Sequence, residues 1–311
     1  MTRTTRKATA AGILLAAVTL AVSACSGTTS LPGSGSSASA GTDSVFTDAP
    51  VASADLILSG STMEAIKKRG KLVVAEALDA PLLSQQDPTN PDQVNGFDAD
   101  LAKLLAIYIL GKPNVEIVPP ASETREAMLQ NGTVDVVFNT YTITEERATQ
   151  VDFAGPYFES GLAVAVKSDN DKIKSVKDLD GKNVIVGANT PAVTAVPEVA
   201  PTAKVTAFAT DPAAVQALIQ GRGDAYVQDY TLLASDAASE KQIKVVGAPF
   251  TKEPYGIGLK HGDSDFKSFV NEWLKTIQKG GQWGKAWKTT LGTVTDSAIP
   301  TPPAIGSVPG S

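Results

Sequence analysis

The stretch FDADLAKLLAIYIL, residues 97–110, decides the fold class of this chain. Its leucines and isoleucines recur at three- and four-residue spacing, which predicts a helix with one apolar face. KLVVAEAL (71–78) before it and VEIVP (115–119) after it are short apolar runs typical of buried strands. A strand, a helix and a second strand in this order predict a parallel sheet covered by helices, so the expected class is α/β.

The same alternation continues along the chain. TREAMLQNG (124–132) predicts a helix that stops at its Asn-Gly pair, and VDVVFNT (134–140) predicts a strand. A helix, a glycine turn and a strand are then expected twice, in DKIKSVKDLDGKNVIVGANT (171–190) and in DPAAVQALIQGRGDAYVQD (211–229). PYGIGLK (254–260) predicts a last strand, and helical sequence follows it.

The order of these units predicts two lobes. At 311 residues the chain exceeds what one hydrophobic core usually supports. The segments FAGPYFESG (153–161) and PFTKEPYGIG (249–258) are rich in Gly, Pro and aromatic residues, as hinge strands can be. If the chain crosses at both, residues 159–255 form a second lobe inserted into a first lobe made of 56–158 plus 256–292.

The first residues predict export. Residues 1–24 contain Arg3, Arg6 and Lys7 near their start and continue with AAGILLAAVTLAV, which is shorter than the ~20 residues of a membrane-spanning helix. VSAC (22–25) resembles the lipobox of bacterial lipoproteins, and this resemblance implies cleavage before Cys25 and a lipid on it. Cys25 is the single cysteine, so no internal disulfide forms. We therefore expect an exported protein held on the outer face of the cell membrane by its lipid.

Both ends of the chain have compositions that disfavour folding. Residues 25–55 contain the lipidated cysteine and a stretch rich in Ser, Gly and Thr, which predicts a flexible tether. About thirty such residues reach on the order of 30 Å. The Pro- and Ser-rich residues 293–311 predict a flexible tail.

Composition also excludes several functions. The net charge is −6 and no basic stripe is present, so nucleic acid is not an expected partner. The single histidine, His261, lies in a KHGD turn, and no His/Cys cluster suits a metal, so no cofactor is expected. No paired acid and base stands out as catalytic, which favours a protein that is not an enzyme.

Four segments together carry a family resemblance. In order, NGFDADLAKLLA (95–106), TREAMLQNGTVDVV (124–137), TYTITEERATQVDFAGPYF (140–158) and ALIQGRGDAYVQD (217–229) resemble the extracytoplasmic solute-binding proteins that feed polar amino acids to ABC importers. The likeness is to family 3 members, especially glutamate- and glutamine-binding lipoproteins. It implies a periplasmic-binding-protein-like fold of type II, with two lobes of parallel-rich sheets joined by two hinge crossings. It also implies a monomer that captures a free amino acid by lobe closure and delivers it to ABC permease subunits.

The resemblance assigns the two charged ends of the ligand. Arg147 matches the arginine that holds the α-carboxylate, and a guanidinium is a planar, two-pronged donor for such a group. Asp229 matches the aspartate that takes the α-ammonium from the second lobe. Two other readings remain open: Arg147 pairs with a glutamate next to it, or Asp229 caps the helix that follows it.

Hydroxyl groups surround these two residues in the sequence. Thr144 can cap the helix that carries Arg147, and Thr140 and Thr142 alternate on one face of an extended segment, so both can reach one ligand. Thr190, with Asn189 before it, lies near where the family places a hydroxyl on the second lobe.

Further residues bear on the ligand side chain. Ser122 and Arg125 resemble a Ser-x-x-Arg pair that acidic-ligand members direct at that side chain. Tyr141 either walls the ligand or packs in the lobe core and hinge. Asp211 falls near another such position, where it repels a carboxylate and accepts from an amide; alternatively it pairs with Arg125. We therefore rank Glu, Gln, Asp and Asn ahead of Lys, Arg and His.

Two other functions fit the same pattern. A lipid-anchored binding protein can present its ligand to a membrane signalling protein instead of a permease. A few members of this fold are dehydratases of small carboxylic acids, and this third reading needs an acid or base placed in the cleft.

Overall fold

The computed structural model describes residues 44–294 and 298–311. The predicted signal segment, the lipid site Cys25 and most of the predicted tether therefore lie outside the described residues. Residues 44–311 carry four clusters of buried apolar side chains, so this part of the chain has its own cores. Within the described ranges, we find no helix with the length and apolar character needed to cross a bilayer.

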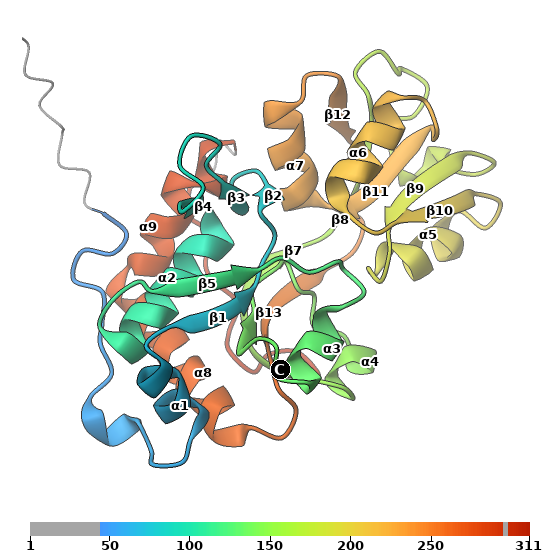
Figure 1. Cartoon of the computed structure of the whole chain (residues 1–311). Helices are drawn as coiled ribbons and strands as arrows, with labels where there is room; N and C mark the ends of the chain where they lie inside the picture. Colours follow the sequence, from blue (N-terminus) through green and yellow to red (C-terminus); the bar gives the residue numbers. More distant parts are fainter. Residues whose placement is uncertain (1–43, 295–297) are drawn as a thin grey trace, which may run out of the picture. The chain divides into compact units, whose positions relative to one another are not determined.

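The first sheet has five strands, and we call the part of the body around it the first lobe (Figure 1). β1 is parallel to β5 and β6, and β13 is antiparallel to β6 and β7. In spatial order the strands are β5 (Val115–Val118), β1 (Leu72–Ala75), β6 (Val136–Val137), β13 (Glu253–Leu259) and β7 (Asp152–Ser160). A small sheet beside it contains β2 (Asp79–Ala80), β3 (Ser84–Gln86) and β4 (Val94–Asn95).

The helices of the first lobe include the one predicted for residues 97–110. That helix is α2 (Phe97–Leu110), and its bounds are those of the prediction because Gly96 precedes it and Gly111 ends it in the left-handed conformation, at φ 72°. α2 packs against α1, α8 and α9. The other helical segments are η1 (Ala54–Leu56), α1 (Thr62–Arg69), α3 (Arg125–Gln130), α4 (Glu145–Ala148), α8 (Ser264–Gly280), α9 (Gln282–Thr289) and η3 (Leu291–Thr293).

The second sheet also has five strands, and we call the part around it the second lobe. β9 is parallel to β10 and β11, whereas β8 is antiparallel to β11 and β12. The order is β10 (Lys204–Phe208), β9 (Asn183–Gly187), β11 (Ala225–Asp229), β8 (Leu162–Lys167) and β12 (Ile243–Val246). Its helical segments are η2 (Val176–Asp178), α5 (Ala192–Val199), α6 (Asp211–Ile219) and α7 (Tyr230–Ser239).

The chain passes between the two sheets twice, which confirms the predicted pair of crossings. β7 of the first sheet leads into β8 of the second, and β12 leads back into β13. The two connections touch: a Cβ on Gly161 would lie 2.3 Å from the carbonyl oxygen of Thr251, and the Thr251 hydroxyl accepts from the Leu162 amide at 2.8 Å. A glycine is therefore needed at this crossing.

Three predicted segments differ from the structure. Within the predicted tether, Val45 is buried in the core of the first lobe, and the Ala52 amide donates to the Tyr108 carbonyl. The apolar residues of this polar stretch pack against that core and order it. Residues 298–311, part of the predicted tail, also lie against the body, with Ile305 packed on the same core. The helix expected after residue 171 is only the short 3-10 turn η2.

Candidate ligand-binding site

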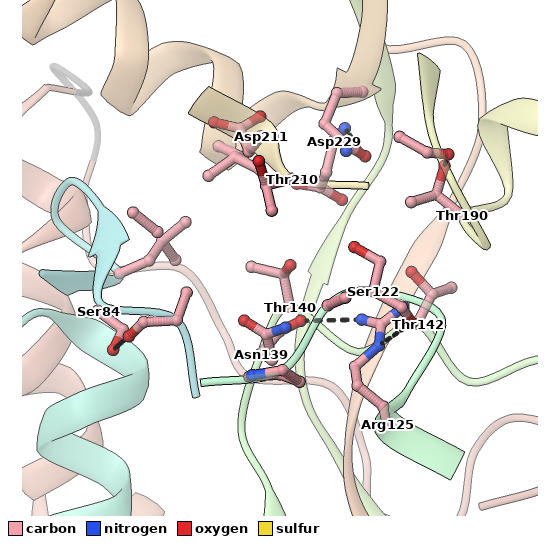
Figure 2. A pocket seen from close by; sticks show the side chains of 18 of the residues that line it. Ser84, Ser122, Arg125, Asn139, Thr140, Thr142, Thr190, Thr210, Asp211 and Asp229 are labelled. Atoms are coloured by element: carbon pink, nitrogen blue, oxygen red, sulfur yellow. Dashed lines mark hydrogen bonds between the residues drawn. The ribbon is translucent and has the colours of Figure 1, made fainter. Parts of the chain in front are cut away.

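A cavity of about 420 Å³ lies between the two lobes (Figure 2). This volume falls in the roughly 300–1,000 Å³ range of small-molecule sites. All but two of the predicted ligand-contacting residues line it; the two that do not are Asn189 and Tyr141. The predicted residues that line it are Ser122, Arg125, Thr140, Thr142 and Arg147 from the first lobe and Thr190, Asp211 and Asp229 from the second.

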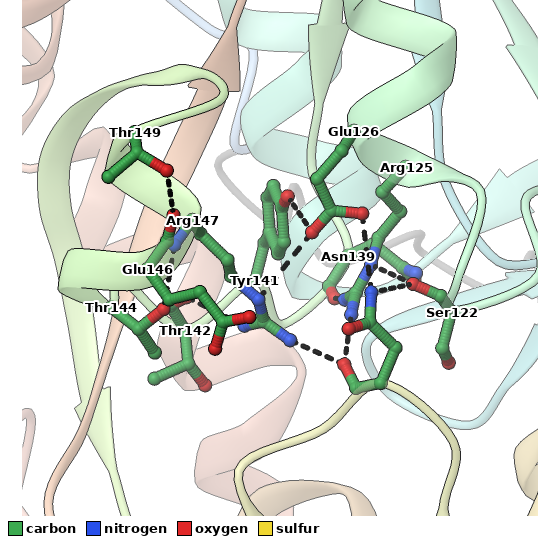
Figure 3. Close-up of polar contacts among 11 residues, drawn as sticks. Ser122, Arg125, Glu126, Asn139, Tyr141, Thr142, Thr144, Glu146, Arg147 and Thr149 are labelled. Atoms are coloured by element: carbon green, nitrogen blue, oxygen red, sulfur yellow. Dashed lines mark hydrogen bonds and ion pairs between the residues drawn. The ribbon is translucent and has the colours of Figure 1, made fainter.

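Arg147 lies in the short helix α4, which Thr144 caps by accepting from the Arg147 amide at 3.1 Å, as predicted. The guanidinium donates to the carbonyl of Thr142 at 2.7 Å and to that of Asn189 at 2.5 Å (Figure 3). Its Nε lies 3.6 Å from the Glu126 carboxylate, so its ionic neighbour is not a glutamate of its own helix. Burial lowers the pKa of Arg147.

Arg125 lies beside Arg147 and not at a separate end of the cavity. Both guanidiniums stack on the Tyr141 ring, at 4.4 and 4.9 Å from its centroid, and both donate to the Asn189 carbonyl. Arg125 also donates to the Ser122 carbonyl at 2.9 Å. Burial, together with the charge of Arg147, lowers the pKa of Arg125 to about 10. The two arginines therefore make one concentrated positive region that suits an anion.

The two predicted residues outside the cavity lining support the arginines instead. Tyr141 is fully buried, and its hydroxyl donates to Glu126 at 2.6 Å. Asn189 has a left-handed backbone (φ 52°), and its side-chain amide donates to the Ser122 carbonyl and the Glu126 carboxylate, at 3.2 and 3.3 Å. Its carbonyl thereby reaches across from the second lobe to both guanidiniums.

Asp229 presents one satisfied and one free oxygen. Its Oδ1 accepts from the Ser160 hydroxyl at 2.7 Å, from the Thr231 amide and hydroxyl at 3.0 and 2.9 Å, and from the Tyr255 hydroxyl. The Thr231 contacts make Asp229 the predicted cap of α7. Its Oδ2 is buried without a partner among the described residues. Burial raises the pKa of Asp229 to about 6, although its hydrogen bonds act in the opposite direction.

Asp98 was missed by the sequence reasoning. It lines the cavity from α2 and accepts from the Thr140 amide at 2.9 Å and the Tyr157 hydroxyl at 2.8 Å. Thr140 has a φ of 43°, a strained conformation for a β-branched residue. The bond to Asp98 holds Thr140 in this conformation at the cavity wall. Asp98 and Asp100 both lie in the first turn of α2, where acidic residues are common, so the sequence did not single out Asp98.

A second acidic group lies where the lobes meet at β2 and α7. Asp79 and Asp211 line the cavity, and Asp211 accepts from the Tyr226 hydroxyl at 2.6 Å, not from Arg125. Asp211 also shares a hydrogen bond with Asp236. Burial raises the pKa of both carboxyls, and the charge of Asp211 raises the pKa of Asp236 further.

In the described part of the chain, no group of three or more His, Cys, Asp or Glu residues is arranged to hold a metal ion. His261 is exposed and does not line the cavity; its Nδ1 lies 3.1 Å from Oδ1 of Asp152.

Two sheets joined by two crossings, with charged groups of opposite sign facing one cavity, define a two-lobed binding protein. Residues 72–293 match the family of bacterial extracellular solute-binding proteins, family 3, and the chain belongs to this family.

Named relatives and solved structures agree with this assignment. The ABC transporter glutamine-binding protein GlnH of Bacillus subtilis is 38% identical over 229 residues, which are 73% of this chain and 83% of the relative. The glutamate-binding protein GluB of Corynebacterium efficiens is 30% identical over 273 residues, covering 80% and 92%. A solved ancestral arginine-binding protein bound to glutamine superposes with a TM-score of 0.67 at 38% identity, covering 72% of this chain and 99% of that one.

Proposed function

We propose that this chain captures a polar amino acid, with glutamine as the first candidate, and delivers it to an ABC importer. One observation carries the proposal: Arg147 and Arg125 line the cavity from one lobe, and Asp229, whose Oδ2 has no hydrogen-bond partner among the described residues, lines it from the other. A zwitterion pairs with both at once only when the lobes are closed. The ligand thus binds the closed state more tightly than the open state, so ligand binding drives closure of the lobes.

The charges of the wall favour an amide over a carboxylate side chain. Both arginines lie at one place, where the ligand α-carboxylate is expected, so neither is left to neutralise a second carboxylate. The remaining charged groups of the lining are acidic, and Asp79 and Asp211 lie at the contact between the lobes. An amide can donate to them, whereas a glutamate tip is repelled. An arginine side chain also suits an acidic wall and is the second candidate.

The relatives support the wider setting of this proposal. GlnH is named as an ABC transporter protein, and the family is one of extracellular proteins, which fits export to the outer face of the membrane. We propose that the chain works there as a monomer that is not an enzyme, anchored by a lipid on Cys25. A role as a sensor for a membrane signalling protein uses the same cavity, and loss of amino-acid uptake on deletion of the gene would favour the importer.

Calorimetric titration of residues 44–311, refolded to remove carried-over ligand, against the twenty amino acids tests the function. We expect glutamine to bind most tightly, at micromolar affinity or better. If only arginine or lysine binds, the preference for an amide side chain is wrong, but capture of an amino acid between the two lobes still holds. Absence of binding heat with every amino acid would overturn the proposal. Dehydratase activity on small carboxylic acids would then be assayed.

The affinity should fall in acid. A ligand ammonium needs Asp229 ionised, but in the ligand-free protein the pKa of Asp229 is raised to about 6. Binding therefore releases a proton below this pH, and we expect the dissociation constant to rise about tenfold between pH 7 and pH 5. Titrations in buffers of different ionisation heat measure the proton release. A dissociation constant that stays constant over this range would contradict the role of Asp229.

A further inference from the structure

The carboxyl group of Glu253 is the strongest unexplained feature of the cavity. Glu253 is the first residue of β13, the strand by which the chain returns to the first lobe, and it lines the cavity. The residue is only 4% exposed. Its Oε1 accepts from the Thr251 hydroxyl at 2.8 Å, while its Oε2 is buried and has no hydrogen-bond partner among the described residues.

A buried carboxylate oxygen without a partner costs free energy, so its retention beside a cavity points to a ligand donor. The surroundings limit which donor this is. Burial raises the pKa of Glu253, while hydrogen bonding from the Thr251 and Thr142 hydroxyls and the charge of Arg147 act in the opposite direction. Arg147 is the residue expected to hold the ligand α-carboxylate, so the donor is a cationic group within a bond or two of that carboxylate.

Asp229 presents a second oxygen of the same kind in the same cavity: Oδ2 is buried and unpartnered, in a side chain that is 5% exposed. An ammonium has three N–H donors and needs more acceptors than one carboxylate oxygen provides. We propose that Glu253 is a second acceptor for the ligand α-ammonium, and that Asp229 and Glu253 hold this group together. The inference rests on the proposed capture of an amino acid.

An ammonium held by both carboxylates would connect the second lobe to the hinge. Asp229 ends β11 in the second lobe, whereas Glu253 belongs to the hinge strand itself. An ammonium bound by both ties the second lobe to the hinge, next to the crossing at which Gly161 and Thr251 are in contact. Binding of the amino group then fixes the hinge directly, besides bridging the lobes.

The test compares Glu253→Gln with the wild type, using residues 44–311 and two probes. One probe is L-glutamine, and the other is glutaramate, in which a hydrogen replaces the α-ammonium; displacement of glutamine measures its weaker binding. We expect Glu253→Gln to weaken L-glutamine at least tenfold and glutaramate less than threefold, because only the first ligand carries the group that Glu253 contacts. Glu159→Gln is the matched control: this hinge glutamate is exposed, pairs with Lys252, and should change neither affinity by more than about twofold.

The possible results separate a ligand-binding role of Glu253 from a structural one. An equal loss for both probes would mean that Glu253 only supports the hinge, and an unchanged L-glutamine affinity would also overturn the inference while the proposed function stands. If the wild type binds no amino acid, the function and this inference both fail. Should Glu253→Gln not fold, a crystal structure of the wild type with L-glutamine serves instead: the inference requires the ligand nitrogen within about 3.2 Å of a Glu253 oxygen.

Discussion

Arg147→Ala should lose binding of the amino acid by more than a hundredfold. Its guanidinium is buried, held by two backbone carbonyls and beside Glu126, so it is ready to bind without further ordering. Removing one partner of a desolvated charge pair costs about 2–5 kcal/mol, and each 1.4 kcal/mol is a factor of ten in affinity. Calorimetry with glutamine measures the loss, and circular dichroism checks that the variant is folded.

Two further variants make this result specific. Arg147→Lys keeps the positive charge beside Glu126 but loses the planar fork, so we expect an intermediate loss of roughly tenfold. Arg222→Ala removes an exposed arginine that stacks on Phe208, and it should leave the affinity unchanged. If Arg147→Ala binds as well as Arg222→Ala does, Arg147 is a structural residue and the anion end of the ligand lies elsewhere.

The regular parts of the fold could be predicted from the sequence because local signals agree with the packing. α2 has the predicted bounds, since its apolar period and the glycines at its ends act together. The ends of the body were not predicted. The Ser- and Gly-rich tether gives no local signal that Val45 will be covered by a core assembled from residues far along the chain.

The site was predicted where a family motif carried it and missed where distant contacts decide. Arg147 and Asp229 lie on the cavity as predicted, but Asn189 reaches the arginines through its carbonyl, which no residue-type pattern can indicate. Arg125 lies beside Arg147 because both guanidiniums stack on the ring of Tyr141, which lies in a loop distant from Arg125 in the sequence. Glu253 had one signal: a charged residue at the start of an apolar hinge strand.

Asp229→Asn should separate binding from stability. The asparagine keeps an acceptor for the four donors on Oδ1 and removes the charge, so the cap of α7 persists. Without the carboxylate, we expect affinity for glutamine to fall on the order of a hundredfold, about 3 kcal/mol. Asp236→Asn is the control: Asp236 lies outside the cavity lining, and burial together with the charge of Asp211 raises its pKa, so its variant should bind within about threefold of the wild type.

The same substitution should stabilise the ligand-free protein above pH 7. The pKa of Asp229 is raised in the folded state, so its contribution to stability is present in acid and is lost as the pH rises through about 6. The neutral asparagine avoids this loss, and a gain of 1 kcal/mol corresponds to about 2–4 °C in a domain of this size. Thermal unfolding at pH 8 without ligand should therefore show a midpoint a few degrees higher for Asp229→Asn. A lower midpoint with unchanged affinity would make Asp229 a cap of α7 and not a ligand residue.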